Sequence, residues 1–238
     1  MTDPRPLDGK LALVTGASRG IGAATAEALG KAGAHVILTA RTVSGLEAVE
    51  EAIHGAGGAA TIAPLDLSDL DAIPKLAGAI AERWGSLDIM VLNAAMLGSL
   101  SPVEHLDPKE LERVFKLNVF ASQAMIAAFD SLLRRAEKAD VIGITSSVGG
   151  EPRAFWGGYG ASKAAFDTLL GAYADETAHA GRLRVQIIDP GATRTRMRQL
   201  AFPGEEPESV KPPEAVASAI IELLQDAGET GSRHRVEG

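Results

Sequence analysis

The sequence contains no cysteine, which excludes disulfide bonds and thiolate chemistry. Aromatic residues make up only 4% of the chain, so the core has to be built mainly from Ala, Val, Ile and Leu. A net charge of -8 argues against a nucleic-acid partner, because phosphates require a basic face. No apolar run approaches the roughly 20 residues of a membrane span, and the opening residues MTDPRPLDGK do not resemble a secretory signal. We therefore expect a soluble cytoplasmic protein with no nucleic-acid or membrane partner.

Short apolar runs alternate with longer segments of helical periodicity along the whole chain. The runs are continuous, as in strands buried on both faces of a parallel sheet; they are Leu11–Thr15, His35–Ala40, Ala60–Leu65, Leu87–Leu92, Val141–Thr145 and Leu183–Ile188. Helical patterns follow at 20–32, 44–55, 69–84, 107–137, 157–180 and 213–226. This repeat predicts an α/β protein, a Rossmann-type doubly wound parallel sheet of about seven strands with helices on both faces. No linker divides the chain, so we expect a single domain, 1–238.

One segment, 193–211, interrupts this rhythm between the last apolar run and the next helix. It carries Pro203, Gly204 and Pro207 among mixed charges. Ligands of open α/β sheets bind outside the carboxyl ends of the strands, where this segment should lie. Its position favours a mobile substrate-binding flap, with a tolerated surface insertion as the alternative.

The first apolar run, LALVT, leads directly into a glycine-rich turn and then an Ala-rich helix. The turn reads Gly16-Ala17-Ser18-Arg19-Gly20-Ile21-Gly22, with the glycines spaced GxxxGxG. Glycines allow a tight turn and a close approach to a pyrophosphate, which sits at the N-terminus of the following helix. Such glycines also occur as packing devices, but three of them at the first strand-to-helix turn favour a dinucleotide site.

The segment TGASRGIG resembles the cofactor fingerprint of the short-chain dehydrogenase/reductase family. The resemblance continues in order through Asp66-Leu67, Asn93-Ala94-Ala95, Asn118, Ser146, Tyr159-x-x-x-Lys163 and Pro190-Gly191. The resemblance covers nearly the whole chain. Within the family, the sequence resembles the NADP-preferring, bacterial oxoacyl-reductase-like branch. The resemblance implies a nicotinamide-dependent dehydrogenase or reductase of small carbonyl or alcohol substrates.

The end of the second strand indicates which nicotinamide cofactor is used. A carboxylate there binds the ribose 2′-hydroxyl of NAD, whereas an arginine accommodates the 2′-phosphate of NADP. This chain has Ala40 where NAD-dependent members of the family carry an acid, and Arg41 follows it. Arg19 matches the family's second phosphate-binding position. Both could be ordinary solvated arginines, but the missing acid favours NADP(H).

The resemblance assigns the other cofactor contacts. Asp66 should meet the adenine amino group with Leu67 packed beside it, although an Asp in this place can also cap a helix. Asn93 should support the sheet and the cofactor, and Ala95 replaces a family glycine. The full cofactor-binding set is Gly16, Ser18, Arg19, Gly20, Ile21, Gly22, Arg41, Asp66, Leu67, Asn93, Ala94, Ala95, Tyr159, Lys163, Pro190, Gly191, Thr193 and Thr195.

Four residues form the candidate catalytic group. Tyr159 and Lys163 are four apart in a helical segment and share one face, a spacing that chance alone gives in roughly 7% of such chains. Ser146 ends an apolar run thirteen residues before Tyr159, as the family's catalytic serine does. Asn118 lies on an apolar stripe, where it is either a satisfied core residue or the family's fourth catalytic position. Together they form a specific signal.

The chemistry of carbonyl reduction gives these side chains their roles. Ser146 should hydrogen-bond the carbonyl oxygen and Tyr159 should deliver the proton. The charge of Lys163 should lower the pKa of Tyr159, and by resemblance Lys163 also holds the nicotinamide ribose while Asn118 anchors a water relay. Nicotinamide chemistry needs no metal, and no metal cluster is evident in the sequence. Alcohol oxidation by the same residues, a noncatalytic NADP-binding sensor and a purely structural oligomer are the alternatives.

Several features leave the substrate and the assembly open. Phe155 and Trp156 either line an apolar entrance or pack their loop. Arg194, Arg196 and Arg198 either bind an anionic substrate or offset nearby acids of the same segment, which are Glu205, Glu206 and Glu208. The tail Gly231–Gly238 departs from the family's final strand and acidic ending.

We expect a homodimer or larger homo-oligomer, because the helices at 107–137 and 157–180 are apolar on more than one face. The residues concerned include Phe120, Ala127, Ala165, Leu169 and Tyr173.

Overall fold

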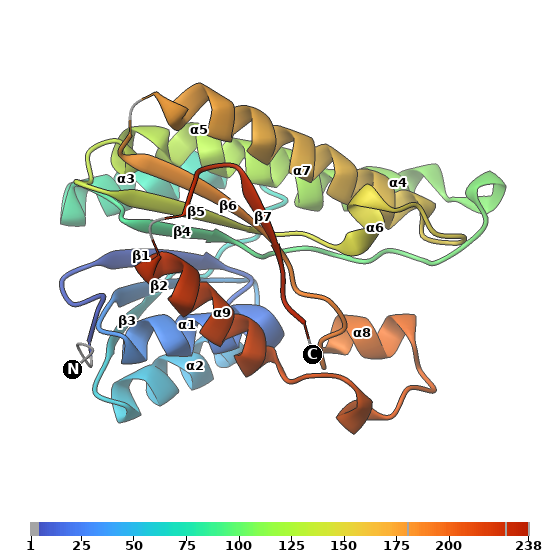
Figure 1. Ribbon diagram of the computed structural model, residues 1–238, viewed down its shortest axis with the longest axis horizontal. Coiled ribbons are helices and arrows are strands. Elements are labelled where there is room, and N and C mark those ends of the chain that lie inside the picture. Colours follow the sequence, from blue (N-terminus) through green and yellow to red (C-terminus); the bar gives the residue numbers. More distant parts are fainter. Residues whose placement is uncertain (1–4, 180, 227, 238) are drawn as a thin grey trace.

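The computed structural model describes residues 5–179, 181–226 and 228–237. A parallel sheet of seven strands lies at its centre, in the order β3-β2-β1-β4-β5-β6-β7 (Figure 1). The strands are β1 (Leu11–Thr15), β2 (His35–Thr39), β3 (Ala59–Ile62), β4 (Ile89–Leu92), β5 (Ala139–Ile144), β6 (Leu183–Asp189) and β7 (Ser232–Arg235). The chain winds outward from β1 in one direction and from β4 in the other, which makes the sheet doubly wound. The predicted fold class is confirmed.

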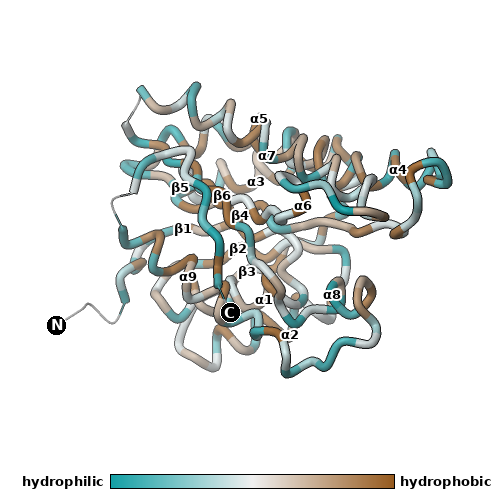
Figure 2. Tube along the Cα trace, turned by 45° about the vertical axis from the view of Figure 1, so that its right-hand side comes forward, coloured by the Kyte–Doolittle hydropathy of each residue, from teal (hydrophilic) through white to brown (hydrophobic). Residues whose placement is uncertain are grey.

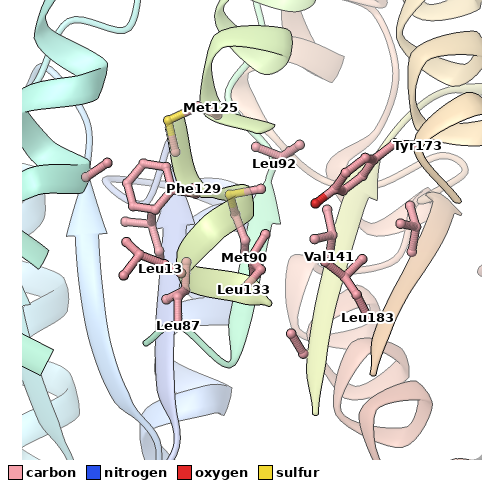
Figure 3. Close-up of a cluster of buried hydrophobic side chains, with 14 of the residues drawn as sticks. Leu13, Leu87, Met90, Leu92, Met125, Phe129, Leu133, Val141, Tyr173 and Leu183 are labelled. Carbon is pink, nitrogen blue, oxygen red and sulfur yellow. The ribbon is translucent and has the colours of Figure 1, made fainter. Parts of the chain in front are cut away.

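Helices cover both faces of the sheet (Figure 1). One face carries α1 (Gly20–Lys31), α2 (Val43–Gly55) and α9 (Pro213–Gln225), and the other carries α3 (Ala72–Trp84), α4 (Pro108–Phe115), α5 (Ala121–Leu133) and α7 (Gly157–Ala178). Two separate apolar clusters fill the two layers between helices and sheet. Figure 3 shows Met125 and Phe129 of α5 facing Leu13 and Met90 of the sheet. Apart from the segment 107–137, the predicted runs and helices match these elements to within three residues at each end.

The helix expected over 107–137 is present from Pro108 to Leu133, but it is not regular throughout. It consists of α4, a π-helical turn η2 (Lys116–Phe120) and α5, and residues 134–137 lie outside it. A π turn inserts one extra residue into a helix, and such turns are frequent at functional sites. Here the turn contains Asn118, whose side chain contacts other elements, as described below. The apolar periodicity on both sides of the turn is helical, so it does not reveal the π turn.

The last strand, β7, has a polar sequence, Ser-Arg-His-Arg, and pairs with β6 so that Arg233 lies opposite Ile187. In Figure 2 the chain that leads to the C-terminus is coloured hydrophilic over most of its length. An edge strand has one neighbour and one solvated side, so it does not need a continuous apolar run. Apolar periodicity therefore identified six strands, and the unusual tail supplies the seventh.

Candidate active site

A cavity of about 510 Å³ opens at the carboxyl ends of the parallel strands. It is lined by the loops that follow strands β1 to β6, at the point where the winding direction changes. All the predicted catalytic and cofactor-binding residues line this cavity except Gly22 and Asn118. Residues from positions 16 to 195 of the chain thus meet at one edge of the sheet.

The glycine-rich turn after β1 has a backbone that only glycine adopts easily. Gly16 and Gly20 have φ angles of +66° and +56°. A Cβ on Gly22 would lie 2.3 Å from the carbonyl oxygen of Gly16, so this residue allows the turn to close rather than lining the cavity. Because α1 begins at Gly20 with no acidic residue in its first turn, its N-terminal amides can receive an anion.

Asn93 and Thr15 hold the ends of β4 and β1 together beneath this turn. The side-chain amide of Asn93 donates to the carbonyl of Thr15 over 2.9 Å. The Thr15 hydroxyl accepts from the backbone amides of Asn93 and Ala94, at 2.9 and 3.0 Å, and donates to the carbonyl of Val91. Sequence reasoning missed Thr15, although a buried hydroxyl at the end of an otherwise apolar strand was a visible signal.

Two exposed arginines stand on one side of the cavity. Arg19, in the glycine turn, and Arg41, just after β2, both line it, and neither makes an ion pair with any described residue. Ala40 brings no carboxylate beside them. Asp66, which follows β3 and also lines the cavity, accepts a hydrogen bond from the backbone amide of Ser68 at 2.9 Å. The next helix, α3, begins only at Ala72, so Asp66 closes a local turn and does not cap a helix.

The catalytic candidates meet where β5 ends and α7 begins. Ser146 follows β5, Tyr159 lies in the first turn of α7, and Lys163 lies one turn later. The Lys163 ammonium donates to the carbonyl of Ile144 at 2.8 Å and lies 5.8 Å from the centre of the Tyr159 ring. The approach of α7 requires Gly160, because a Cβ there would lie 2.8 Å from the carbonyl oxygen of Val148.

Burial controls the ionisation of both groups. Tyr159 is 7% exposed and Lys163 is 3% exposed. Burial lowers the pKa of Lys163 to about 8, and the carboxylate of Asp167 partly opposes this effect. Burial also raises the pKa of Tyr159, and the charges of Asp189 and Asp167 raise it further. The expected lowering of the Tyr159 pKa by Lys163 is therefore wrong for the chain by itself, and the phenol stays protonated at neutral pH.

Asn118 lies in the π turn and is buried rather than in the cavity wall. Its amide group pairs with the backbone of Met96, accepting from the amide at 2.8 Å and donating to the carbonyl at 3.0 Å. It also donates to the Ser162 hydroxyl at 2.9 Å, and this hydroxyl donates to the Tyr159 carbonyl at 2.7 Å. Asn118 thus links the loop after β4 to the turn of α7 that carries Tyr159.

The side of the cavity next to Tyr159 is apolar. Leu97, Val148 and Tyr159 form a third cluster of buried residues, against which Trp156 and Met197 pack. The Trp156 ring meets the Tyr159 ring edge-on with 6.1 Å between centroids. Its neighbour Phe155 points elsewhere: it is 57% exposed and does not line the cavity.

The segment 193–211 is more regular than its composition suggested. It contains α8 (Arg196–Ala201), capped by the Thr195 hydroxyl, and the short turn η3 (Pro207–Ser209). The two ends of the segment meet, because the amide of Arg194 donates to the carbonyl of Lys211 at 2.8 Å. The Thr195 cap and the contacts between its two ends therefore give the segment a folded structure.

The three arginines of this segment differ in their surroundings. Arg198 makes a bidentate pair with Glu205, at 2.6 and 2.5 Å, and lies over the Phe202 ring. The interpretation as a local ion pair therefore holds for Arg198. Arg194 and Arg196 are exposed, line the cavity and make no ion pair with a described residue.

In the part of the chain that the structure describes, no helix is long and apolar enough to cross a membrane.

Comparison with known proteins places this geometry among known folds. The family model described as short chain dehydrogenase matches residues 10–206. The oxidoreductase YciK of Escherichia coli K12 is 35% identical over 223 residues, covering 92% of this chain and 88% of YciK. A short chain dehydrogenase from Shigella flexneri, solved in complex with NADP, superposes with a TM-score of 0.94 at 34% identity, covering 99% of this chain and 100% of that chain.

Two further solved structures are equally similar. One from Escherichia coli CFT073, solved in complex with NADPH, has a TM-score of 0.94 at 34% identity and covers 99% of this chain and 100% of its own. One from Pseudomonas syringae has a TM-score of 0.95 at 36% identity and covers 100% of this chain and 98% of its own. Both are short chain dehydrogenases.

Proposed function

The chain belongs to the short-chain dehydrogenase family of oxidoreductases, and we propose that it is an NADPH-dependent reductase that converts a small-molecule carbonyl into an alcohol. One observation carries the proposal: the glycine-rich turn, Ser146, Tyr159 and Lys163 line the same cavity. A cofactor site and a proton donor beside one another are what a hydride transfer to a carbonyl requires.

The cavity fits NADP(H). The N-terminus of α1 and the glycine turn provide backbone amides for a pyrophosphate, and no side chain of the turn itself caps this helix. Arg19 and Arg41 provide two positive charges for a 2′-phosphate. Asp66, Asn93, Pro190 and Gly191 supply the remaining walls. The similar structures from Shigella flexneri and Escherichia coli CFT073 were solved with NADP and NADPH, which supports this choice over NAD.

When bound, the reduced nicotinamide supplies a hydride to the carbonyl carbon. The residues of the chain handle the oxygen, on which negative charge builds. Ser146 donates a hydrogen bond to it, and Tyr159 transfers its phenolic proton to complete the alcohol. Lys163 offers a positive charge beside the phenolate that forms, and the hydrogen-bonded path from Asn118 through Ser162 holds this turn of α7 in place.

The ionisation of Tyr159 suits its proposed role as proton donor. Reduction needs the protonated phenol. A tyrosine hydroxyl is already protonated at neutral pH, and burial raises the pKa of Tyr159 further. A noncatalytic sensor would need neither a buried tyrosine nor the buried Lys163 one turn away, and burying that ammonium is costly.

The apolar wall beside Tyr159 supports a substrate whose carbonyl carries an apolar or aromatic group. Leu97, Trp156 and Met197 surround the place where that group would lie. We also propose that the segment 193–211 is the substrate-binding flap. Its helix α8 forms part of this wall, and the two ends of the segment are joined by the bridge between Thr193 and Lys211.

The decisive experiment is to follow NADPH oxidation with a panel of ketones, aldehydes and oxoacyl thioesters, using two matched variants. Tyr159→Phe should abolish turnover while leaving NADPH binding nearly intact. The chain has only one other tyrosine, Tyr173, whose hydroxyl donates to Asp130 on α5 and does not line the cavity. Tyr173→Phe should keep its activity. If Tyr159→Phe kept most of its turnover, the proposed mechanism would be overturned.

A further inference from the structure

The polar strand at the end of the chain contacts the catalytic site through Arg233. Its guanidinium donates to the Oδ2 atom of Asp167 at 2.5 Å and to the backbone carbonyl of Ser146 at 3.2 Å. Ser146 lies just after β5 and Asp167 lies on α7. One side chain from the edge strand therefore joins the backbone of the candidate serine to the helix of the candidate tyrosine and lysine.

Asp167 is placed where its charge matters. It lies one helical turn after Lys163, so the two side chains share a face of α7. Only 15% of its side chain is exposed, and Arg233 is its sole ion-pair partner among the described residues. Its other oxygen, Oδ1, is buried and accepts no hydrogen bond from any described group. Such a carboxylate would be costly in this position without a neighbouring positive charge.

We propose that Arg233 is a positioning residue of the reductase site, which anchors the Ser146 backbone and offsets the Asp167 charge beside Lys163. The proposal rests on the proposed function for the roles of Ser146 and Lys163. It also gives a purpose to a tail that departs from the family's usual ending. Arg233 itself does not line the cavity, so it acts through its two partners.

The charges of Asp167 and Arg233 should have opposite effects on the pKa of Lys163. Asp167 from α7 and Asp189 from β6 are the carboxylates that act on Tyr159, and Asp167 also acts on Lys163. Removing the Asp167 charge should make the Lys163 ammonium easier to deprotonate. Removing the Arg233 charge should do the reverse, because it leaves Asp167 uncompensated. A residue that only packed the tail would not produce two shifts of opposite sign.

The test is a titration of Lys163 in the full chain without ligand, followed by NMR of lysine labelled with carbon-13 at Cε. The resonance is assigned by its loss in Lys163→Met. From a wild-type pKa of about 8, we expect a downward shift in Asp167→Asn and an upward shift in Arg233→Met. Each shift should be about 0.5 to 1 pH unit, less than a charge in direct contact produces. The double variant should return close to the wild-type value.

Arg235→Met is the matched control. Arg235 lies two residues further along β7, and its ion pair with Glu237 is at the exposed surface. We expect no shift of the Lys163 pKa in this variant. Arg233→Lys keeps the charge but replaces the planar fork by a single ammonium. Arg233→Lys should therefore keep the Lys163 pKa close to wild type while weakening the hydrogen bond to the Ser146 carbonyl.

Turnover provides the second readout. Arg233→Met should lower kcat about tenfold through misplacement of Ser146, with a smaller change in the KM for NADPH. Arg233→Lys should recover part of this loss. The titration needs no turnover, so it tests the inference even if the proposed reductase activity is not found. The inference would be overturned if the pKa of Lys163 shifted in the same direction in Asp167→Asn and Arg233→Met, or if it shifted in neither variant. If Arg233→Met does not fold, Arg233→Gln, which also removes the charge, takes its place in the titration.

Discussion

The ring of Trp156 lies 5.8 Å from the ring of Phe202, at an interplanar angle of 32°. Trp156 precedes α7 and Phe202 follows α8, so this contact joins the proposed flap to the Tyr159 side of the cavity. The guanidinium of Arg153 lies over both rings, 5.8 and 5.3 Å from their centres. An aromatic contact flanked by a cation therefore links the segment 193–211 to the loop before α7.

Loss of this contact should loosen the flap. An aromatic pair contributes about 0.5 to 1.5 kcal/mol, so Phe202→Ala should raise the KM for apolar carbonyl substrates about two- to tenfold, with a smaller change in kcat. Limited proteolysis should also cut within 193–211 more quickly. Leu200→Ala, in the same segment but 68% exposed, is the control and should behave as wild type. Equal effects of the two substitutions would show that the ring contact does not hold the flap.

Arg41 and Arg19 should determine the cofactor preference. We expect NADPH to bind at least tenfold more tightly than NADH, because each charge-assisted contact to the 2′-phosphate is worth about 1.5 to 3 kcal/mol. Arg41→Asp should remove or reverse this preference in calorimetric titrations with both cofactors. Lys75→Asp, which makes the same change of charge on the exposed side of α3, should leave it unaltered. Equal affinity of the unaltered protein for the two cofactors would refute this assignment.

The buried pair of Arg184 and Asp140 should dominate the electrostatic contribution to stability. Their charged atoms are 2.6 Å apart with less than a tenth of each side chain exposed. Arg184→Ala should cost about 3 to 5 kcal/mol in the free energy of unfolding. Arg134→Ala, which breaks the exposed pair with Asp130, should cost at most about 1 kcal/mol.

The loss of unfolding free energy in Arg184→Ala should grow as the pH rises. Burial already raises the pKa of Asp140, and removal of Arg184 raises it further. A carboxyl with a raised pKa in the folded state takes up protons more readily than in the unfolded state. Stability is therefore lost as pH rises from the unfolded pKa through the folded one. Urea unfolding at pH 4.5 and pH 7 should show the larger deficit at pH 7, and a deficit independent of pH would contradict this explanation.

Two glycines in helices should respond oppositely to alanine. In Gly22→Ala the new Cβ would lie 2.3 Å from the Gly16 carbonyl oxygen, so the glycine turn must shift. We expect a loss of about 1 to 3 kcal/mol of stability together with weaker NADPH binding. At Gly78, on the open side of α3, a Cβ would meet nothing within 4 Å. Gly78→Ala should therefore stabilise the protein by about 0.5 to 1 kcal/mol in thermal unfolding.

Phe120 of the π turn, together with the half-buried Ala165 and Leu169 of α7, should pair two copies of the chain. Tyr173, which the sequence pattern also placed on this face, is buried and donates to Asp130. Phe120 is 51% exposed at the end of that turn, an unusual state for a large apolar side chain within a packed layer. We expect a dimer or larger oligomer in sedimentation at micromolar concentration, and dissociation in Phe120→Glu. Val43→Glu on α2, at a residue of similar exposure, should not change the assembly. A monomeric wild-type protein would count decisively against the prediction.

The sequence by itself determined the features that depend on local spacing. Continuous apolar runs identify strands buried on both faces of a sheet, and the GxxxGxG turn identifies the strand-to-helix junction. Tyr159 and Lys163 had to share a face because they are four residues apart in one helix. Since parallel strands present their carboxyl ends at one edge, even the meeting of Ser146 with the glycine turn followed from the order of elements.

Tertiary structure decided everything that depends on burial or on contacts between distant segments. The π turn at Asn118 and the pairing of this side chain with Met96 and Ser162 are encoded by no local pattern. The raised pKa of Tyr159 reflects desolvation by surrounding segments, whereas its lysine neighbour alone predicts a lowered pKa. The contact of Arg233 with Asp167 spans 66 residues and depends on β7 joining the sheet. A polar edge strand carries no hydrophobic signal, so only the folded chain could place it beside the site.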